Sequence, residues 1–262
     1  MTQQEAHRRP ILWWLPIVAL NVSFWIVAPV MTLIYGCGTV LYATIVHYLL
    51  RNPRFTKRVI RRSLSYYAAI LLRCGWPLVR VRFVDFDPGQ KPPVVLVANH
   101  RSSSDGFMLA FVPFECVEIL NIWPSRLPIV GAIGRVAEFL RVREMPFDEF
   151  LEAGSRLISV GCSVIAFPEG TRSGSRALGQ FHGAAFRLAQ HCSVSVVPIA
   201  IAGNEKIPPR GSALLRPGRI TVTRLPPITP AEYAGMSPYQ LKNLARDRIR
   251  TYMDTIEPGG GH

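Results

Sequence analysis

Two short polar segments of the chain carry residue types suited to acid–base chemistry, and the first is Val94–Asp105. In this stretch, VVLVANHRSSSD, His100 and Asp105 stand five residues apart. Val94–Ala98 has the length and β-branched content of a buried strand, and Ser102–Ser104 are good N-caps for a following helix. We therefore predict His100 at the C-terminal end of a strand and Asp105 in the first turn of a helix. The carboxylate could then hold one imidazole nitrogen and leave the other to act as a base. The alternative is a helix N-terminus at which the helix dipole favours Asp105, with His100 as a surface turn residue.

The second segment is Pro168–Ser173, PEGTRS, which follows the apolar run Ser163–Phe167. If that run is a parallel strand, its C-terminal end lies at the same sheet edge as His100. Arg172 offers a planar fork suited to phosphate, and Gly170 lets the backbone approach a ligand closely. The N–H groups of Gly170, Thr171 and Ser173 could add donors. Glu169 would repel a phosphate, so we expect it to fix an arginine or to accept from a substrate hydroxyl. A polar turn with an internal Glu–Arg pair is the alternative.

The N-terminal region, which precedes both motifs, is strongly apolar. Ile11–Leu50 contains no Asp, Glu, Lys or Arg, and one bilayer crossing needs about 20 apolar residues. Pro29 and Gly36–Gly38 offer places to break the run. Both flanks are basic, with His7–Arg9 before it and several arginines after it, and positive charge favours the cytoplasmic side. We expect a helical hairpin over residues 1–50 with both ends in the cytoplasm. A cleaved signal peptide is the competing interpretation, but the apolar run is too long for one.

Charge and composition indicate the kind of partner. The chain of 262 residues has a net charge of +13, a pI near 10.1 and a mean hydropathy of +0.21. Phe55–Arg73 has apolar residues at helical spacing and arginines on another face, which predicts a basic amphipathic helix lying on anionic headgroups. A solvated basic face on a core-packed helix is the alternative. We expect no nucleic-acid partner, because the basic cluster adjoins the apolar segment. Five scattered cysteines indicate reduced thiols and support no metal site.

The remainder of the chain alternates short apolar runs with helical patterns, which predicts a layered α/β domain. The expected strands are Val79–Val84, Val94–Ala98, Glu138–Arg143, Ser163–Phe167, Val194–Ala202 and, as an edge strand, Arg219–Arg224. The expected helices are Asp105–Val112, Asp148–Val160, His182–His191 and one that a capping box opens at Ser237 and that runs to Ile256, with a short helix or turn at Pro128–Arg135. The expected organisation is a membrane hairpin at 1–50, an interfacial helix at 51–75, a catalytic domain at 76–256 and a flexible tail at 257–262.

Both polar segments resemble motifs of one enzyme superfamily. Asn99-His100-x4-Asp105 and Phe167–Ser173 are similar to the first and third motifs of the glycerolipid acyltransferases, which acylate glycerol phosphate and lysophosphatidic acid. Phe139–Arg143 resembles the segment of that family that ends in a substrate-binding arginine, and Val197–Ile199 resembles its proline-containing fourth block. The chain departs from the pattern at Ala137-Glu138, where a glycine is usual, so Arg141 competes with Arg143 for the substrate. His182 replaces a lysine common after the third motif.

The resemblance implies a fold and a reaction. The fold is a layered α/β acyltransferase domain with a mixed sheet flanked by helices. The reaction is acyl transfer from a thioester of coenzyme A or acyl carrier protein to lysophosphatidic acid, giving phosphatidic acid. His100 and Asp105 would be catalytic. The implied substrate-binding residues are Asn99, Arg143, Glu169, Gly170, Thr171, Arg172 and Ser173. No metal or resident cofactor is expected. Membrane lipids are the expected partners, with the catalytic domain on the cytoplasmic face.

Three other functions stay open on the sequence. The first is the same chemistry on another lyso-lipid or specialised acceptor, and the second is hydrolysis of acyl thioesters with water as acceptor. The third is a non-catalytic membrane protein that binds anionic lipid through its basic helix.

Overall fold

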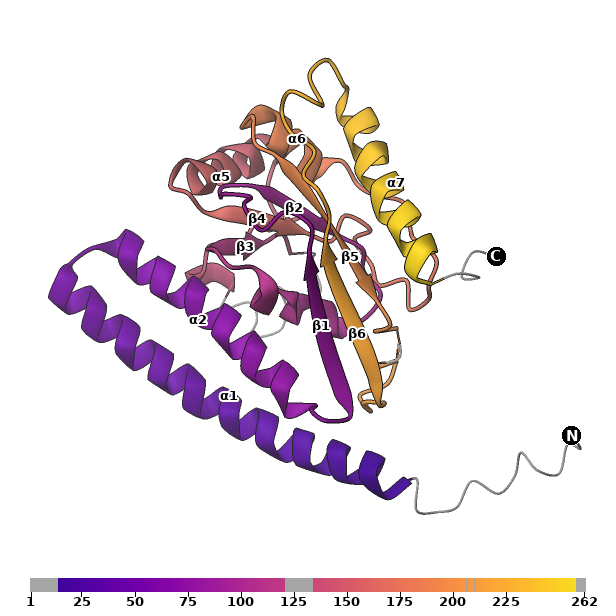
Figure 1. Cartoon of the computed structure of the whole chain (residues 1–262). Helices are drawn as coiled ribbons and strands as arrows, with labels where there is room; N and C mark the ends of the chain where they lie inside the picture. The colour runs from indigo at the N-terminus through magenta and orange to yellow at the C-terminus, as the bar shows by residue number, and fades with distance from the viewer. Residues whose placement is uncertain (1–13, 121–133, 206, 210, 258–262) are drawn as a thin grey trace, which may run out of the picture.

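The protein is organised around one six-stranded mixed sheet with helices on both faces (Figure 1). The computed structural model describes residues 14–120, 134–205, 207–209 and 211–257. The basic residues His7–Arg9, most of the turn expected at Pro128–Arg135 and the tail after residue 257 lie outside this range. The strand order is β1-β6-β5-β2-β4-β3, and every neighbouring pair is parallel except β5 and β6. The predicted mixed α/β sheet is therefore confirmed.

The strands lie close to their predicted positions, with three differences. They are β1 (Val79–Asp85), β2 (Val95–Ala98), β3 (Cys116–Glu118), β4 (Ser163–Ala166), β5 (Val196–Ala202) and β6 (Gly218–Arg224). The prediction that Arg219–Arg224 forms an edge strand is wrong, because β6 is paired on both sides, with β1 and β5. The three-residue strand β3 was not predicted, since so short a segment shows no periodicity.

Residues 138–143, expected as a strand, contribute only an isolated bridge between Leu140 and Ile119. Glu138 has a positive φ of 61°, and its carboxylate is held by Lys57 and Arg61. The left-handed residue delays the start of the run, and a turn in which Glu144 N–H donates to Arg141 O at 2.9 Å ends it, so the alternation in the sequence does not produce a strand.

The two faces of the sheet carry two separate hydrophobic cores. Val95 and Val97 of β2 face one core together with α5 (Phe147–Ser159), α6 (Ala184–His191) and α7 (Pro238–Ile256). Leu96 and Ala98 face the other, which includes Met108 of the 3₁₀ helix η3 (Ser103–Phe111) and Leu20 near the N-terminus. Alternate residues of a strand point to opposite faces, so β2 is buried on both sides and its C-terminal end is held rigidly. The predicted capping box of α7 is confirmed at Ser237 and Gln240. The helix expected after Ser102–Ser104 is present as a 3₁₀ helix.

The predicted hairpin within residues 1–50 is wrong. Trp14–Leu50 is one continuous helix, α1, with Pro29 inside it. A proline forfeits one backbone hydrogen bond, and here the turns on both sides remain helical. The chain reverses only at Arg51, whose φ is 48°, and Asn52 then caps the next helix with Pro53 at its first position. The hairpin is thus formed by α1 with α2 (Pro53–Cys74), which pack side by side (Figure 1).

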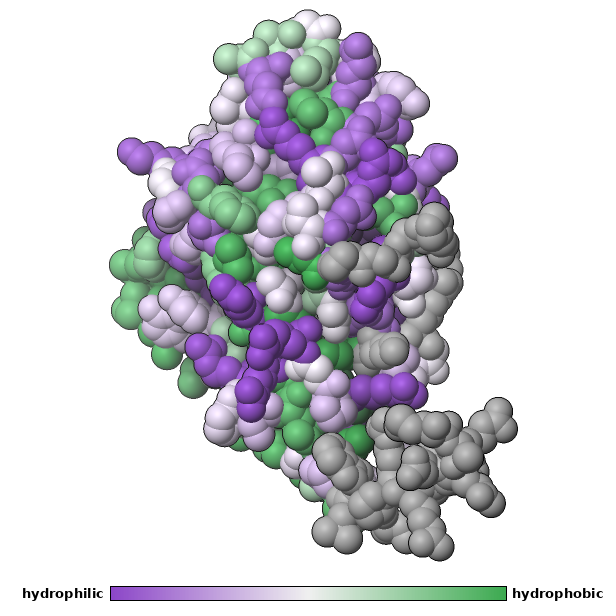
Figure 2. Space-filling view, turned by 45° about the vertical axis from the view of Figure 1, so that its right-hand side comes forward, coloured by the Kyte–Doolittle hydropathy of each residue, from purple (hydrophilic) through white to green (hydrophobic). Residues whose placement is uncertain are grey.

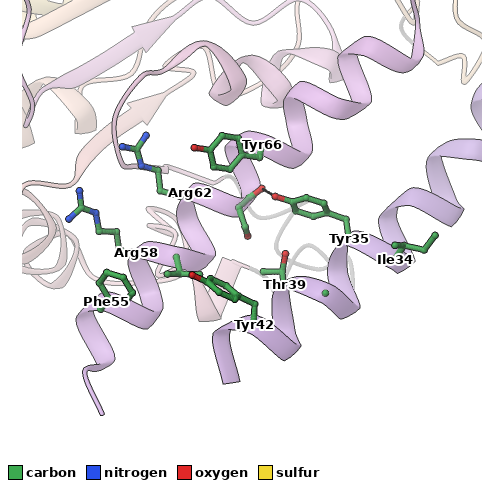
Figure 3. Close-up of a pocket in the computed structure, with 11 residues that line it drawn as sticks. Ile34, Tyr35, Thr39, Tyr42, Phe55, Arg58, Arg62 and Tyr66 are labelled. Atoms are coloured by element: carbon green, nitrogen blue, oxygen red, sulfur yellow. Dashed lines mark hydrogen bonds between the residues drawn. The ribbon is translucent and has the colours of Figure 1, made fainter. Parts of the chain in front are cut away.

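The amphipathic helix predicted at Phe55–Arg73 is confirmed as α2. Part of its basic face docks on the domain, because Arg61 is only 5% exposed and forms ion pairs with Glu115 and Glu138. Its other side lies against α1, where Figure 3 shows a groove lined by side chains from both helices. The Tyr35 hydroxyl donates to the Ser63 carbonyl oxygen across that groove at 3.0 Å. Helix α2 is therefore packed against both the domain and α1, and its contact with anionic headgroups stays a prediction.

Apolar side chains remain exposed along α1, among them Trp14, Leu33 and Leu49. The helix is long and apolar enough to cross a membrane by length and composition. On the face shown in Figure 2, hydrophilic side chains instead cover much of the upper part and alternate with smaller hydrophobic areas. The surface of the helical pair thus differs in character from that of the domain.

Candidate active site

The structure brings His100 and Asp105 together as the sequence predicts. His100 follows β2 by two residues, and its Nδ1 lies 2.8 Å from Asp105 Oδ2. The imidazole keeps 21% of its surface exposed, whereas the carboxylate is fully buried. The Phe167 ring packs against the imidazole at 4.7 Å between centroids. Since Asp105 occupies Nδ1, Nε2 is the nitrogen left to meet a substrate proton.

The Asp105 carboxylate is fixed by four donors. Its Oδ2 accepts from the backbone N–H groups of Arg101 at 2.7 Å and Ser102 at 2.9 Å, in addition to its contact with His100. Its Oδ1 accepts from the side-chain amide of Asn204. A buried carboxylate with this many partners stays in one orientation and therefore holds the ring in one orientation too.

Asn204 was missed by the sequence reasoning. It follows β5, which pairs in parallel with β2, so its position at the same sheet edge was predictable from the strand pattern. Nothing in its own residue type, however, marks it as a partner of Asp105.

Glu169 supports the loop that carries His100 through backbone N–H groups, whereas an arginine or a substrate hydroxyl was the expected partner. One carboxylate oxygen accepts from the His100 backbone N–H at 2.7 Å, and the other accepts from Gly179 N–H at 2.9 Å. The side chain is buried, which raises its pKa, and the two backbone hydrogen bonds oppose that rise. Ser173 N–H donates to the His100 carbonyl oxygen at 2.8 Å, so both ends of this residue are held by the second motif.

Asn99, expected to bind substrate, uses its side chain within the fold. It is fully buried, and its side chain exchanges two hydrogen bonds with the Ile201 backbone, at 2.9 and 2.7 Å. These bonds join the C-terminal ends of β2 and β5. Asn99 therefore fixes the strand end from which His100 projects, and its contact with substrate stays a prediction.

A cavity of about 220 Å³ brings Arg143, Gly170 and His182 together. Gly170 has a φ of 69°, and a Cβ there would lie 3.2 Å from the His182 ring and 4.0 Å from an Arg143 nitrogen. Arg141 instead forms an ion pair with Glu144 at 3.0 Å. The structure thus distinguishes the two arginines, because only Arg143 lies in the cavity beside the second motif.

The other residues of the second motif lie in different surroundings. Gly170 N–H donates to Phe167 O at 3.0 Å and Ser173 N–H to His100, so these two amides serve the turn itself and do not form the predicted donor nest. Thr171 is exposed, and Arg172 lines a second, larger cavity together with Ser103 and Ser104.

Glu118 ends β3, next to β4 in the sheet. Burial, and then the negative charge of Asp105, raise the pKa of Glu118 to about 8.

Arg101 ties the loop that carries His100 to the end of α7. Its side chain is 97% buried and forms an ion pair with Glu257 at 2.8 Å. The loop that carries His100 is therefore tied to the C-terminal helix as well as to the sheet.

Comparison with known proteins places this site in a family context. A profile of the Acyltransferase family matches residues 80–202, which include His100, Asp105 and residues 167–173. A chloroplastic 1-acyl-sn-glycerol-3-phosphate acyltransferase of Arabidopsis thaliana is 34% identical over 173 residues, covering 64% of this chain and 47% of the plant protein. The human 1-acyl-sn-glycerol-3-phosphate acyltransferase alpha is 31% identical over 176 residues, covering 65% of this chain and 60% of the human one. The chain thus spans about half of the length of such relatives.

The fold is similar to a solved structure. The crystal structure of the 1-acyl-sn-glycerophosphate (LPA) acyltransferase PlsC from Thermotoga maritima superposes with a TM-score of 0.73. The match covers 93% of this chain and 98% of the other, at 20% sequence identity. At that identity, the likeness concerns the fold.

Proposed function

We propose that the chain carries an acyltransferase domain of the glycerolipid acyltransferase type and that it transfers a fatty acyl group from a thioester to the free hydroxyl of lysophosphatidic acid. The product is phosphatidic acid. The observation that carries this proposal is the imidazole of His100 at 2.8 Å from a buried, fully hydrogen-bonded carboxylate. The names of the relatives support the acceptor, and the family profile supports the reaction.

In the proposed reaction, His100 Nε2 takes the proton of the acceptor hydroxyl as its oxygen attacks the thioester carbonyl carbon. The new C–O bond forms as the carbonyl becomes a tetrahedral oxyanion. When this collapses, the C–S bond breaks and a thiolate leaves, which takes up the proton from the imidazolium. Asp105 sets the tautomer and stabilises the imidazolium, as the aspartate of a Ser-His-Asp triad does. The substrate hydroxyl occupies the place of the serine, so no acyl-enzyme forms.

Two arginines are the proposed ligands of the acceptor phosphate. Arg143 lies in the cavity beside Gly170, and Arg172 follows the turn that holds His100. A guanidinium binds phosphate through paired, charge-assisted hydrogen bonds. Holding the phosphate beside the base places the hydroxyl close to Nε2, and this positioning supplies part of the rate.

The protein's surroundings belong to the same proposal. The exposed apolar surface of α1 supports attachment to a membrane, and the basic residues of α2 support contact with anionic headgroups. We place the domain on the cytoplasmic face, where soluble thioesters of coenzyme A or acyl carrier protein are available.

The test combines purified protein in phospholipid vesicles with labelled acyl-coenzyme A or acyl carrier protein thioesters. Each donor is offered with lysophosphatidic acid, two other lysophospholipids, a lyso-aminolipid or no acceptor, and the lipid products are resolved. We expect phosphatidic acid from the wild type and from His191→Ala, a control at an exposed histidine, and none from His100→Ala.

Other results would contradict the proposal in distinct ways. If the product were another lipid, the acyl-transfer reaction would stand and the acceptor would be a different lyso-lipid. Free fatty acid without acceptor would indicate a thioesterase. No transfer to any acceptor while donor binding is intact would favour a non-catalytic lipid-binding protein.

A further inference from the structure

One arginine of the loop that carries His100 is almost fully buried. The Arg101 side chain is 3% exposed, and an arginine is rarely buried unless its charge is paired. Its guanidinium donates to both carboxylate oxygens of Glu257, at 2.8 and 3.1 Å, and to the Arg176 carbonyl oxygen at 2.8 Å. Glu205 lies 3.7 Å from the same guanidinium. Three segments that are far apart in the sequence therefore meet on this one side chain.

The charges around Arg101 balance one another. Glu205 also pairs with Arg176, at 3.5 Å, so two guanidinium groups face two carboxylates in this cluster. The side chains of Glu205 and Glu257 are 15% and 12% exposed, so the centre of the cluster is largely shielded from water. A buried ion pair contributes little net stability, because its attraction is offset by the cost of removing both charges from water. The cluster is therefore better explained by the geometry that it fixes than by the stability that it adds.

The geometry in question is that of the His100–Asp105 pair, which Arg101 reaches through its backbone. The Arg101 N–H donates to Asp105 Oδ2 at 2.7 Å, and that same oxygen lies 2.8 Å from His100 Nδ1. Because the guanidinium and the N–H belong to one residue, anchoring the side chain also fixes the direction of the N–H. A displaced Arg101 would withdraw one donor from the buried carboxylate and let it turn.

Two of the segments that hold the guanidinium also hold the pair itself. Arg176 lies three residues after Ser173, whose N–H donates to the histidine carbonyl oxygen at 2.8 Å. Glu205 directly follows Asn204, whose side-chain amide donates to the aspartate Oδ1. Each of these segments therefore contacts both Arg101 and the pair, and together with the loop they form one connected network.

The third segment is the end of α7, which lies outside the residues that the Acyltransferase profile matches. Glu257 caps this helix, and its N–H donates to the Met253 carbonyl oxygen at 2.9 Å. Met253 is buried in the hydrophobic core that α7 shares with α5 and α6. The carboxylate that anchors Arg101 is thus held by a helix that is itself packed on the domain.

We infer that Arg101 and Glu257 are positioning residues for the His100–Asp105 pair, so that the end of α7 sets the orientation of the imidazole. This inference rests on the proposed function and adds a requirement from outside the matched segment. The two side chains act through the Arg101 N–H and the Asp105 carboxylate, and they contact no reacting atom. The proposed phosphate ligand Arg143 lies on a different segment. Loss of the ion pair should therefore lower kcat and leave acceptor binding unchanged.

Steady-state kinetics of Glu257→Gln test this expectation, because the substitution removes the charge and keeps the size of the side chain. We expect kcat for phosphatidic acid formation to fall about 10- to 100-fold, the order of loss that a misplacement of about 1 Å produces. KM for lysophosphatidic acid should match the wild type. The control, Glu232→Gln, breaks a surface pair with Arg248 of α7 and should keep the wild-type kcat. A wild-type kcat in Glu257→Gln, or a raised KM without a fall in kcat, would overturn the inference.

The imidazole nitrogens of His100 report the geometry without requiring turnover. A hydrogen bond from Nδ1 to a carboxylate fixes the tautomer, so the two nitrogens give well-separated NMR signals, whereas a loosened ring averages them. In protein isotopically labelled at the histidine nitrogens, His100→Ala identifies these signals by their loss. We expect the two signals to move toward each other in folded Glu257→Gln and to match the wild type in Glu232→Gln. Unchanged signals in Glu257→Gln would overturn the inference.

A double variant tests whether the two residues act as one unit. Arg101→Lys keeps the charge but loses the planar fork that reaches Glu257 and Arg176 together. Combined with Glu257→Gln, it should lower kcat little more than the larger of the two single losses. Single losses that multiply in the double variant would show that the residues act separately, against the inference.

These experiments separate this inference from the proposed function. If the protein transferred no acyl group to any acceptor, the imidazole signals would still show whether the end of α7 orients His100. If transfer to lysophosphatidic acid were undiminished in Glu257→Gln, only the inference about Arg101 and Glu257 would fail. Should Arg101→Lys not fold, as judged by thermal melting, the kinetics and the imidazole signals of Glu257→Gln decide. Should Glu257→Gln not fold, Glu257→Asp takes its place and should show a smaller loss of kcat, with a wild-type kcat again contradicting the inference.

Discussion

Replacing Asp105 by asparagine separates the charge of this carboxylate from its structural role. The wild-type oxygens accept from His100, from two backbone N–H groups and from Asn204. Asparagine keeps one oxygen for the backbone groups but places an NH₂ opposite the Asn204 amide. Asn204 can turn its amide to accept instead, because its own oxygen is buried with no partner among the described residues. We therefore expect Asp105→Asn to fold, with a loss of about 1–2 kcal/mol of unfolding free energy.

Catalysis should suffer far more than stability. Two unit charges about 4 Å apart interact by about 4 kcal/mol at an effective dielectric constant of about 20, and this stabilises the imidazolium formed during attack. Since about 1.4 kcal/mol is a factor of ten in rate, kcat should fall about a thousandfold. The assay follows release of the donor thiol at saturating substrate. Asp247→Asn, at an exposed aspartate on α7, is the matched control and should retain the wild-type kcat.

The reasoning would be refuted by a specific pair of results. If Asp105→Asn kept its melting temperature and its kcat fell less than about tenfold, the buried carboxylate would not be stabilising a charge on His100.

Three further substitutions test individual assignments. Arg143→Gln should raise KM for lysophosphatidic acid about 10- to 100-fold, as expected for a lost charge-assisted bond, while Arg141→Gln should not; equal effects in steady-state kinetics would reject the distinction between them. Glu118 has its pKa raised to about 8 in the native state, so its contribution to stability is complete below about 4.5 and is lost as the pH rises through about 8. Glu118→Gln should remove that loss, and denaturation midpoints that fall equally steeply with pH in both proteins would contradict it. Asn99→Ala should lower the unfolding free energy by about 2–4 kcal/mol because two buried groups of Ile201 lose their partners. It should leave the KM for the acceptor unchanged, and a raised KM in the folded variant would return Asn99 to the binding site.

The sequence was sufficient to predict where His100 and Asp105 lie. Val94–Ala98 and Ser163–Phe167 are apolar runs of strand length, and both form parallel strands next to each other. Because the carboxyl ends of parallel strands share one edge, His100 and the second motif had to converge, and they do. The family resemblance drawn from these two motifs is confirmed by the profile match and the relatives.

The roles of the polar residues around this pair were harder to predict. Asn99 and Glu169 lie within the recognised motifs, but their partners are Ile201 and the backbone of His100, which are 102 and 69 residues away in sequence. Residue type shows that such a side chain needs a partner, whereas only the tertiary arrangement shows which one. Asn204 was missed for the same reason.

The N-terminal helices illustrate a different limit. Pro29 and the nearby glycines have weak helix propensity, and the sequence offers no measure of whether the surrounding apolar turns outweigh it. The real reversal is produced by Arg51, Asn52 and Pro53, a local signal of N-cap and first-turn proline. That signal lies just after the apolar run, whereas the composition of the run itself predicted a break inside it.

The central claim is that His100 activates the acceptor hydroxyl for direct transfer. The most direct measurement is a single turnover in which enzyme preloaded with labelled acyl thioester is mixed with lysophosphatidic acid, and lipid and protein are both analysed. The account predicts one turnover of phosphatidic acid from the wild type, no acyl group on the protein at any time, and no product from His100→Ala that still binds both substrates. An acylated protein that forms before the acceptor is added, or undiminished transfer by His100→Ala, would contradict it.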